Sequence, residues 1–155
     1  MKKILIALDY DPTAEKVAET GYALAKSMNA GVILLHVLAD TKYYLPLEYS
    51  PIMGFSGMPP VDMMEPFPTE ELHNAALSFL ESSRQHLGDS SIKLLTTEGE
   101  FAESILQAAE ENEADIIVVG SHSRSALEKI IMGSVTEKLL HDSNIPLFIV
   151  PTRKK

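Results

Sequence analysis

Cysteine is absent from this chain of 155 residues. The absence excludes disulfides, thiolate metal sites and cysteine nucleophiles, and it suits a reducing cytoplasm. Long apolar runs are also missing, since none approaches the roughly 20 residues that span a bilayer. The N-terminal run ILIAL ends at Asp9, so it is too short for the apolar region of a secretory signal peptide. We therefore expect a soluble, cytoplasmic protein.

Basic residues are few: 13 Lys and Arg stand against 22 Asp and Glu, which gives a net charge of −9 at pH 7. Nucleic-acid binding depends on a basic face that neutralises many phosphates, so this charge balance argues against it. A small anionic ligand remains compatible with the sequence, because backbone amides and one or two cations are enough to hold it.

Five apolar runs alternate with amphipathic helical patterns along the chain. The runs are nearly continuous, which is typical of parallel strands covered on both faces. They span 4–8, 32–38, 92–97 (the weakest), 115–119 and 146–150, and the helical patterns span 13–28, 69–87, 101–113 and a segment from Ser134. This alternation predicts an α/β fold in one domain, residues 1–155: a three-layer sandwich around a five-stranded parallel sheet.

A doubly wound sheet of order 3-2-1-4-5 would place the first and fourth strands side by side. Ligands in such sheets bind beyond the carboxyl ends of the strands at the point where the strand order reverses. In this chain those ends are Asp9, after ILIAL, and Gly120, after DIIVV. The sequence therefore predicts a ligand site between these two residues.

Residues 39–68 interrupt the pattern with six of the nine prolines, three of the five tyrosines and four of the seven methionines. Proline at this density excludes a long helix or a central strand. A connection of this length is either a functional flap or binding surface, or a surface loop that hides its own apolar side chains. The residues alone leave both interpretations open.

The segment GSHSRSALEKIIMGS (120–134) joins the predicted site to the last helix. Glycines and the amides at a helix N-terminus favour a bound anion, and Arg124 would add positive charge. The alternative is purely structural. In it, Ser134 and Glu137 form a capping box at the start of the helix, and Gly133 is only a turn residue.

The spacing Gly120-x2-Ser123-x9-Gly133-Ser134 resembles the nucleotide-binding pattern of the universal stress protein family, G-x2-G-x9-G-(S/T), with serine in place of the second glycine. The stretches KKILIALD, AKSMNAGVILLHV, ADIIVVGSHSR and GSVTEKLL with IPLFIVP resemble the family as well. The resemblance covers almost the whole chain and leaves out only 39–68.

The resemblance implies an adenine-nucleotide alpha-hydrolase-like fold and a homodimer that pairs through the last strand, 146–151. One branch of the family binds ATP, and we expect Mg²⁺ with it; another branch does not bind ATP. The residues that the resemblance and the charge of Arg124 assign to the nucleotide are Ala7, Asp9, Val37, Val119, Gly120, Ser123, Arg124, Gly133, Ser134 and Val135. Ala7 and Val37 would meet the base, Val119 and Gly120 the ribose side, and Ser123 with Gly133–Val135 the phosphates.

The chain departs from the family pattern at two places. Serine at position 123 would cost about 1 kcal/mol if the residue needs a positive φ, which is about fivefold in affinity. The sequence Asp9-Tyr10-Asp11 stands where the family often has Asp-Gly-Ser. Tyr10 would cover or crowd a ligand there, and Asp11 would repel a phosphate.

Three functions are compatible with these residues. The first is an ATP-binding regulatory protein of the stress response. The second is a dimeric stress-related interaction protein that does not bind nucleotide, and the third is a weak ATP hydrolase or another enzyme that acts on an adenylate. Any hydrolysis should be slow, because Asp9 is the one placed general base and no arginine finger is evident.

The five histidines predict no metal site, because none lies three or four residues from another. His36 falls within a predicted strand and is interpreted as a hydrogen-bonded core residue. The acidic stretch EGEFAESI (98–105) is interpreted as stabilising a helix N-terminus.

Overall fold

The computed structural model describes residues 1–38, 69–121 and 133–152. Strands and helices alternate in these ranges: β1 Lys3–Ala7, α1 Ala14–Ser27, β2 Gly31–Leu38, α2 Thr69–Leu87, β3 Lys93–Glu98, α3 Phe101–Glu111, β4 Ile116–Gly120, α4 Ser134–Asp142 and β5 Leu147–Val150. Each element lies where the apolar periodicity predicts it, with ends that differ by one or two residues. The proline-rich segment 39–68 and most of the 120–134 segment lie outside the described residues.

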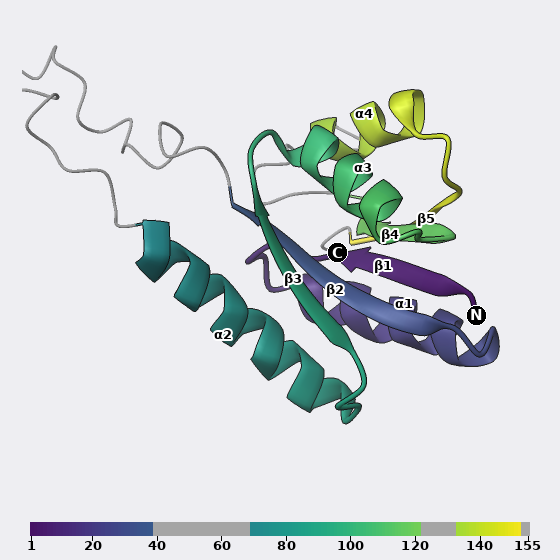
Figure 1. The fold of residues 1–155 in the computed structure, drawn as a ribbon. Coiled ribbons are helices and arrows are strands. Elements are labelled where there is room, and N and C mark those ends of the chain that lie inside the picture. The colour runs from purple at the N-terminus through teal and green to yellow at the C-terminus, as the bar shows by residue number, and fades with distance from the viewer. Residues whose placement is uncertain (39–68, 122–132, 153–155) are drawn as a thin grey trace, which may run out of the picture.

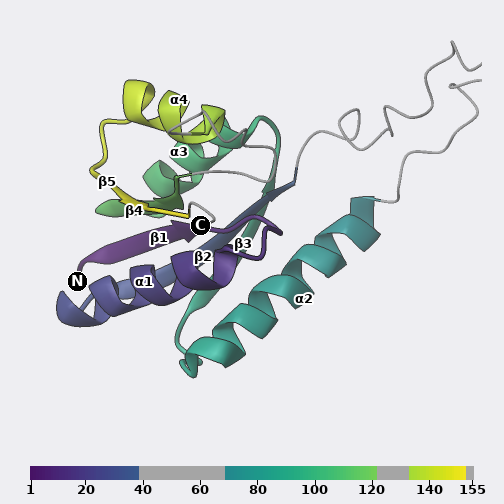
Figure 2. The ribbon, with the colours of Figure 1, turned by 180° about the vertical axis from the view of Figure 1, so that it is seen from behind.

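The five strands form one parallel sheet of order β3-β2-β1-β4-β5. Helices α1 and α2 cover one face of this sheet and α3 and α4 cover the other, so the described chain has three layers (Figures 1 and 2). The predicted fold class and strand order are therefore confirmed. The strand order reverses at β1, which pairs with β2 on one side and β4 on the other.

The core lies on both faces of the sheet, and β1 shows how. Ile4 and Ile6 belong to the apolar cluster with α1 and α2, whereas Leu5 belongs to the cluster with α3 and α4. All three side chains are fully buried. A strand covered on both faces needs apolar side chains at every position, which explains the continuous run in the sequence. Among the described residues, no helix is long and apolar enough to cross a membrane.

Helix α1 approaches β1 closely at Gly21. A Cβ atom at this position would lie 2.7 Å from Ile6 Cδ1 and 3.1 Å from Val118 Cγ1. Gly21→Ala should therefore destabilise the fold by about 1–3 kcal/mol through overpacking, although alanine is the better helix former by about 1 kcal/mol. Chemical denaturation measures the change in the free energy of unfolding.

The exposed Ala23, two residues further along the same helix, provides the control. Ala23→Gly should cost only the difference in helix propensity, about 1 kcal/mol. If Gly21→Ala stabilised the protein, the gain in helix propensity would exceed the cost of overpacking. That result would contradict the prediction that the close approach of α1 to β1 limits this position to glycine.

Candidate functional site

A cavity of about 300 Å³ opens at the carboxyl ends of β1 and β4, where the strand order reverses. This volume lies at the lower end of the range found for small-molecule sites, about 300–1,000 Å³. Eight of the ten residues predicted to contact a nucleotide line it: Ala7, Asp9, Val37, Val119, Gly120, Gly133, Ser134 and Val135. The other two, Ser123 and Arg124, lie outside the described residues. The fold thus brings together residues from four distant segments of the chain.

Helices α1, α3 and α4 all begin at the cavity, and the N-termini of α3 and α4 differ chemically. The carboxylate of Glu100 accepts hydrogen bonds from the backbone amides of Ala102 at 3.3 Å and Glu103 at 2.8 Å, so it caps α3. This confirms the interpretation of the acidic stretch. A carboxylate at this position satisfies the amides that would otherwise attract an anion.

Helix α4 has a glycine at the corresponding position. Gly133 is its N-cap, Ser134 is the first helical residue, and no side chain of a described residue caps the helix. The alternative interpretation, a capping box with Ser134 as the cap, is therefore wrong: Ser134 lies one residue inside the helix, and the amide of Glu137 donates to the Gly133 carbonyl at 2.9 Å. Because Gly133 offers no side-chain acceptor, no described residue caps the amides of Ser134 and Val135, which suit water or a ligand.

Gly133 has an ordinary φ of −69° and ψ of 156°, so its backbone conformation is open to any residue. Gly133 also lines the cavity, where it presents no side chain. Gly120 has a packing role, since a Cβ atom there would lie 3.0 Å from Thr152 Cγ2 and 3.1 Å from Val17 Cγ2. Glycine at position 120 therefore lets the backbone approach these neighbours closely.

A group of hydrogen bonds holds α4 against the ends of the strands. Thr136 Oγ1 donates to the carbonyl of Gly120 at 2.8 Å, and the amide of Gly133 donates to the carbonyl of Ser121 at 2.6 Å. The amide of Ser121 in turn donates to the carbonyl of Val150 at 2.8 Å. The start of α4 is thus tied to β4, and β4 to β5, which fixes the direction of the helix axis toward the cavity.

Comparison with known proteins identifies this architecture. The model of the universal stress protein family matches residues 1–151. The chain belongs to the universal stress protein family. Universal stress protein MJ0577 of Methanocaldococcus jannaschii is 32% identical over 152 residues, covering 96% of this chain and 94% of that protein. The stress response protein NhaX of Bacillus subtilis is 34% identical over 167 residues and covers 96% of each chain.

Solved structures agree with this assignment. The structure of MJ0577 superposes with a TM-score of 0.74 at 28% identity, covering 99% of this chain and 98% of that one. A universal stress protein in complex with cAMP gives a TM-score of 0.65 at 18% identity, covering 98% of each chain. The universal stress protein of Archaeoglobus fulgidus in complex with dAMP gives 0.58 at 19% identity, with 96% and 97% covered. At these lower identities the two complexes show a shared fold.

On the β1 side of the cavity, this universal stress protein carries a carboxyl group and an imidazole. Asp9 Oδ1 accepts a hydrogen bond from the Asp11 amide at 3.0 Å. Partial burial nevertheless raises the pKa of the Asp9 carboxyl, because it outweighs the effect of that hydrogen bond. His36 is buried, and its Nδ1 lies 2.8 Å from the carbonyl oxygen of Leu8. A carbonyl only accepts, so Nδ1 carries the hydrogen, and burial lowers the pKa of this ring.

The two unusual residues after Asp9 serve local structure. The ring of Tyr10 lies against His36 and Phe79, with centroids 4.3 and 5.0 Å apart, and Tyr10 is not among the described residues that line the cavity. The carboxylate of Asp11 accepts hydrogen bonds from the amide of Thr13 at 2.9 Å and from its hydroxyl at 2.7 Å. Tyr10 thus packs over the imidazole from the α2 side, and Asp11 stabilises the turn before α1.

Eight further described residues line the cavity that sequence reasoning did not assign to it: Leu8, Thr13, Ala14, Val17, His36, Phe101, Ile105 and Thr136. Phe101 is the first residue of α3 and is 41% exposed, so an aromatic ring stands at the rim. Phe101 follows closely after the carboxyl end of β3, and the sequence alone could have indicated it as a site residue from this position. His36 was interpreted as a hydrogen-bonded core residue, which is confirmed, and it also contributes to the wall.

The raised pKa of Asp9 gives a stability test. Since the folded-state pKa lies above the unfolded value, the ionised carboxylate destabilises the fold at neutral pH, and this cost vanishes well below the ordinary pKa of 3.8. Asp9→Asn keeps an oxygen for the Asp11 amide and should raise the melting temperature at neutral pH, with no gain in acid. Thermal unfolding at both pH values measures the difference.

Asp89 is the matched control, because hydrogen bonds from the Ser91 side chain and amide lower its pKa. Asp89→Asn should therefore act in the opposite direction and lower the melting temperature at neutral pH. Equal shifts for the two variants would contradict the assigned environment of Asp9.

Proposed function

We propose that this universal stress protein binds an adenine nucleotide, specifically ATP with Mg²⁺, in the cavity between β1 and β4. The observation that carries the proposal is the glycine-capped N-terminus of α4 at the cavity, Gly133–Val135. Uncapped helix amides attract phosphate through their hydrogen atoms and through the helix dipole. The solved family members in complex with cAMP and dAMP support an adenine nucleotide as the ligand class.

The cavity wall divides into an apolar part and an anion-binding part. Ala7, Val37 and Val119 offer apolar contact from three neighbouring strands, which suits a nucleobase and its sugar. The amides of Ser134 and Val135 lie at the α4 end and suit the phosphates. Ser123 and Arg124, outside the described residues, are proposed as further phosphate contacts. Asp9 is proposed to lie beside the nucleotide, where its carboxylate is available to a ribose hydroxyl or the metal.

We favour a regulatory role over catalysis. Among the described residues that line the cavity, Asp9 is the only carboxylate and no arginine is present. Phosphoryl transfer to water requires a positioned base and charge that stabilises the transition state. We infer that nucleotide occupancy, rather than turnover, is what a partner in the stress response recognises. Slow ATP hydrolysis remains the second candidate, and the position of Asp9 is what favours it.

Titration calorimetry with ATP and Mg²⁺ tests the proposal. Wild type should bind, and Gly133→Asp should weaken binding by more than about tenfold, because a carboxylate would fill the space and repel phosphate. Ser90→Asp is the control: it adds the same charge to an exposed residue before the amino end of β3, at the opposite edge of the sheet. Its binding should match wild type.

Two outcomes would contradict nucleotide binding: no heat with wild type at millimolar ATP, or the same loss in both variants. The first would favour the interaction protein that does not bind nucleotide. If wild type does bind, a phosphate-release assay then distinguishes a switch from a slow hydrolase.

We also propose a homodimer that pairs along residues 146–151. Strand β5 is an edge of the described sheet, with β4 as its one neighbour, and its residues Leu147, Phe148 and Ile149 are only partly buried. A short apolar edge strand favours pairing with a second chain, unless Pro146 and Pro151 at its ends prevent it.

Analytical ultracentrifugation at micromolar concentration should give a species of twice the chain mass of 17.0 kDa. The measurement is made with and without ATP, so that assembly and nucleotide binding are judged separately. A single 17.0 kDa species under both conditions would contradict the dimer.

A further inference from the structure

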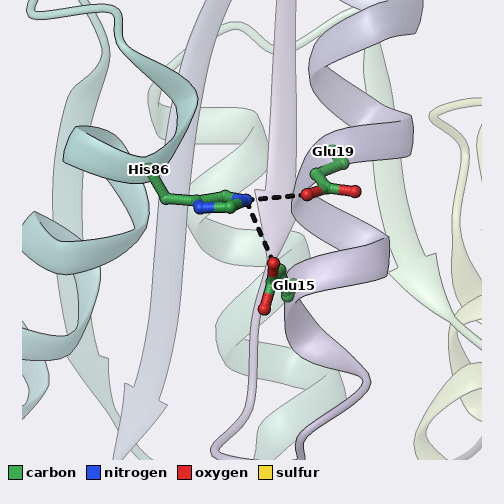
Figure 3. A group of neighbouring side chains, drawn as sticks. All are labelled: Glu15, Glu19 and His86. Atoms are coloured by element: carbon green, nitrogen blue, oxygen red, sulfur yellow. Dashed lines mark hydrogen bonds and ion pairs between the residues drawn. The ribbon is translucent and has the colours of Figure 1, made fainter.

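Three metal-ligating side chains converge between α1 and α2 (Figure 3). Nε2 of His86 lies 3.1 Å from Oε1 of Glu15 and 2.7 Å from Oε1 of Glu19. All three side chains are exposed, and their ligand atoms lie within 4.8 Å of one another. None of the three residues lines the cavity as the described residues form it.

The fold, rather than the cluster itself, brings these residues together. Glu15 and Glu19 are four residues apart on α1, so both project from the same face of the helix. His86 lies in the last turn of α2. The opposite face of α1 is buried through Val17 and Ala18, and α2 is buried through Leu80. The backbones that carry the three ligands are therefore held by the apolar core.

The charge of the cluster is unbalanced. In the part of the chain that the structure describes, no lysine or arginine forms an ion pair with Glu15 or Glu19, and His86 is their shared partner. Two other histidines with acidic neighbours differ from it: the half-exposed His73 meets one carboxylate, of Glu98, and the exposed His141 meets the adjacent Asp142. Among the described residues, only the α1–α2 cluster brings two carboxylates and an imidazole together.

The ligand set and its spacing suit zinc. Zn²⁺ accepts imidazole nitrogen and carboxylate oxygen at about 2.0–2.2 Å, so neighbouring ligand atoms around a tetrahedral ion lie about 3.3 Å apart. The separations of 3.1 and 2.7 Å need only a small widening, which exposed glutamate side chains allow. Three protein ligands leave one position for water. Hard cations such as Mg²⁺ prefer oxygen alone, so the imidazole selects a transition metal.

We propose that Glu15, Glu19 and His86 form a zinc-binding site that joins α1 to α2. The ion would replace the hydrogen bond between His86 and Glu19 and the ion pair between His86 and Glu15. A ligand that binds the folded chain and finds no preformed site in the unfolded chain stabilises the fold. The site is independent of the nucleotide proposal, because it uses different residues on a different surface.

Zinc chloride titrated into the untagged, chelator-treated full chain tests the site in mildly alkaline buffer, because zinc binds the neutral imidazole and protons compete for its nitrogen. We expect one high-affinity zinc per chain and a rise of several degrees in melting temperature. His86→Gln and Glu19→Gln should each weaken this binding at least tenfold, since even outer-sphere changes at zinc sites cost about 10–100-fold. Co²⁺ in place of zinc should give the visible absorption of a low-coordinate site, which His86→Gln removes.

His141→Gln and His73→Gln are the matched controls, because each removes an exposed or half-exposed imidazole beside one carboxylate. Both should bind zinc as wild type does. Far-UV circular dichroism without metal verifies that every variant is folded. The proposal is overturned if wild type shows no zinc-dependent rise in melting temperature, if His86→Gln binds zinc like wild type, or if the controls lose binding equally.

Discussion

The burial of β1 on both faces is the constraint on which the rest of the structure depends. Ile4, Leu5 and Ile6 are all fully buried, so helices must cover the sheet on both sides of this strand. With crossovers of one hand, β2 and β4 then lie on opposite sides of β1. Helices α1 and α4, which follow β1 and β4 in the chain, cover opposite faces of the sheet, and the cavity lies at the carboxyl ends of these two strands. The site is thus a consequence of how the core is buried.

Helices α3 and α4, which both begin at the cavity, show how the chain determines where an anion can bind. Glu100 caps α3 with its own carboxylate and also lies 3.3 Å from Nζ of Lys138 on α4, so its charge is used within the protein. Gly133 gives α4 no such acceptor. In a chain with a net charge of −9, a local source of positive potential is needed to hold a phosphate. The amides at the start of α4 provide this positive potential. Among the described residues that line the cavity there is no lysine or arginine.

The fold and the edge that bears the site were predictable because their signals are local. Continuous apolar runs reveal buried parallel strands, and Asp9 and Gly120 mark the two strand ends at the reversal. The features that sequence reasoning missed depend on tertiary proximity. Tyr10 was predicted to cover or crowd a ligand, and only the fold shows its ring against His36 and Phe79. No other histidine lies three or four residues from His86, and its carboxylate neighbours come from another helix, so the sequence pattern did not indicate this cluster.

At α4 the capping-box pattern places the helix cap one residue too late, at Ser134 instead of Gly133, and this difference has a chemical consequence. Ser134 followed by Glu137 satisfies the capping-box pattern, but the hydrogen bond from the Gly133 amide to the Ser121 carbonyl and that from Thr136 to Gly120 set the start of the helix earlier. Ser134 then lies within the first turn, and its amide belongs to the uncapped set. Gly133 has an unstrained backbone, so a positive φ is not the reason for the family's glycine at this position. A serine at position 133 would have supplied a capping hydroxyl. Gly133 supplies none, and it lines the cavity.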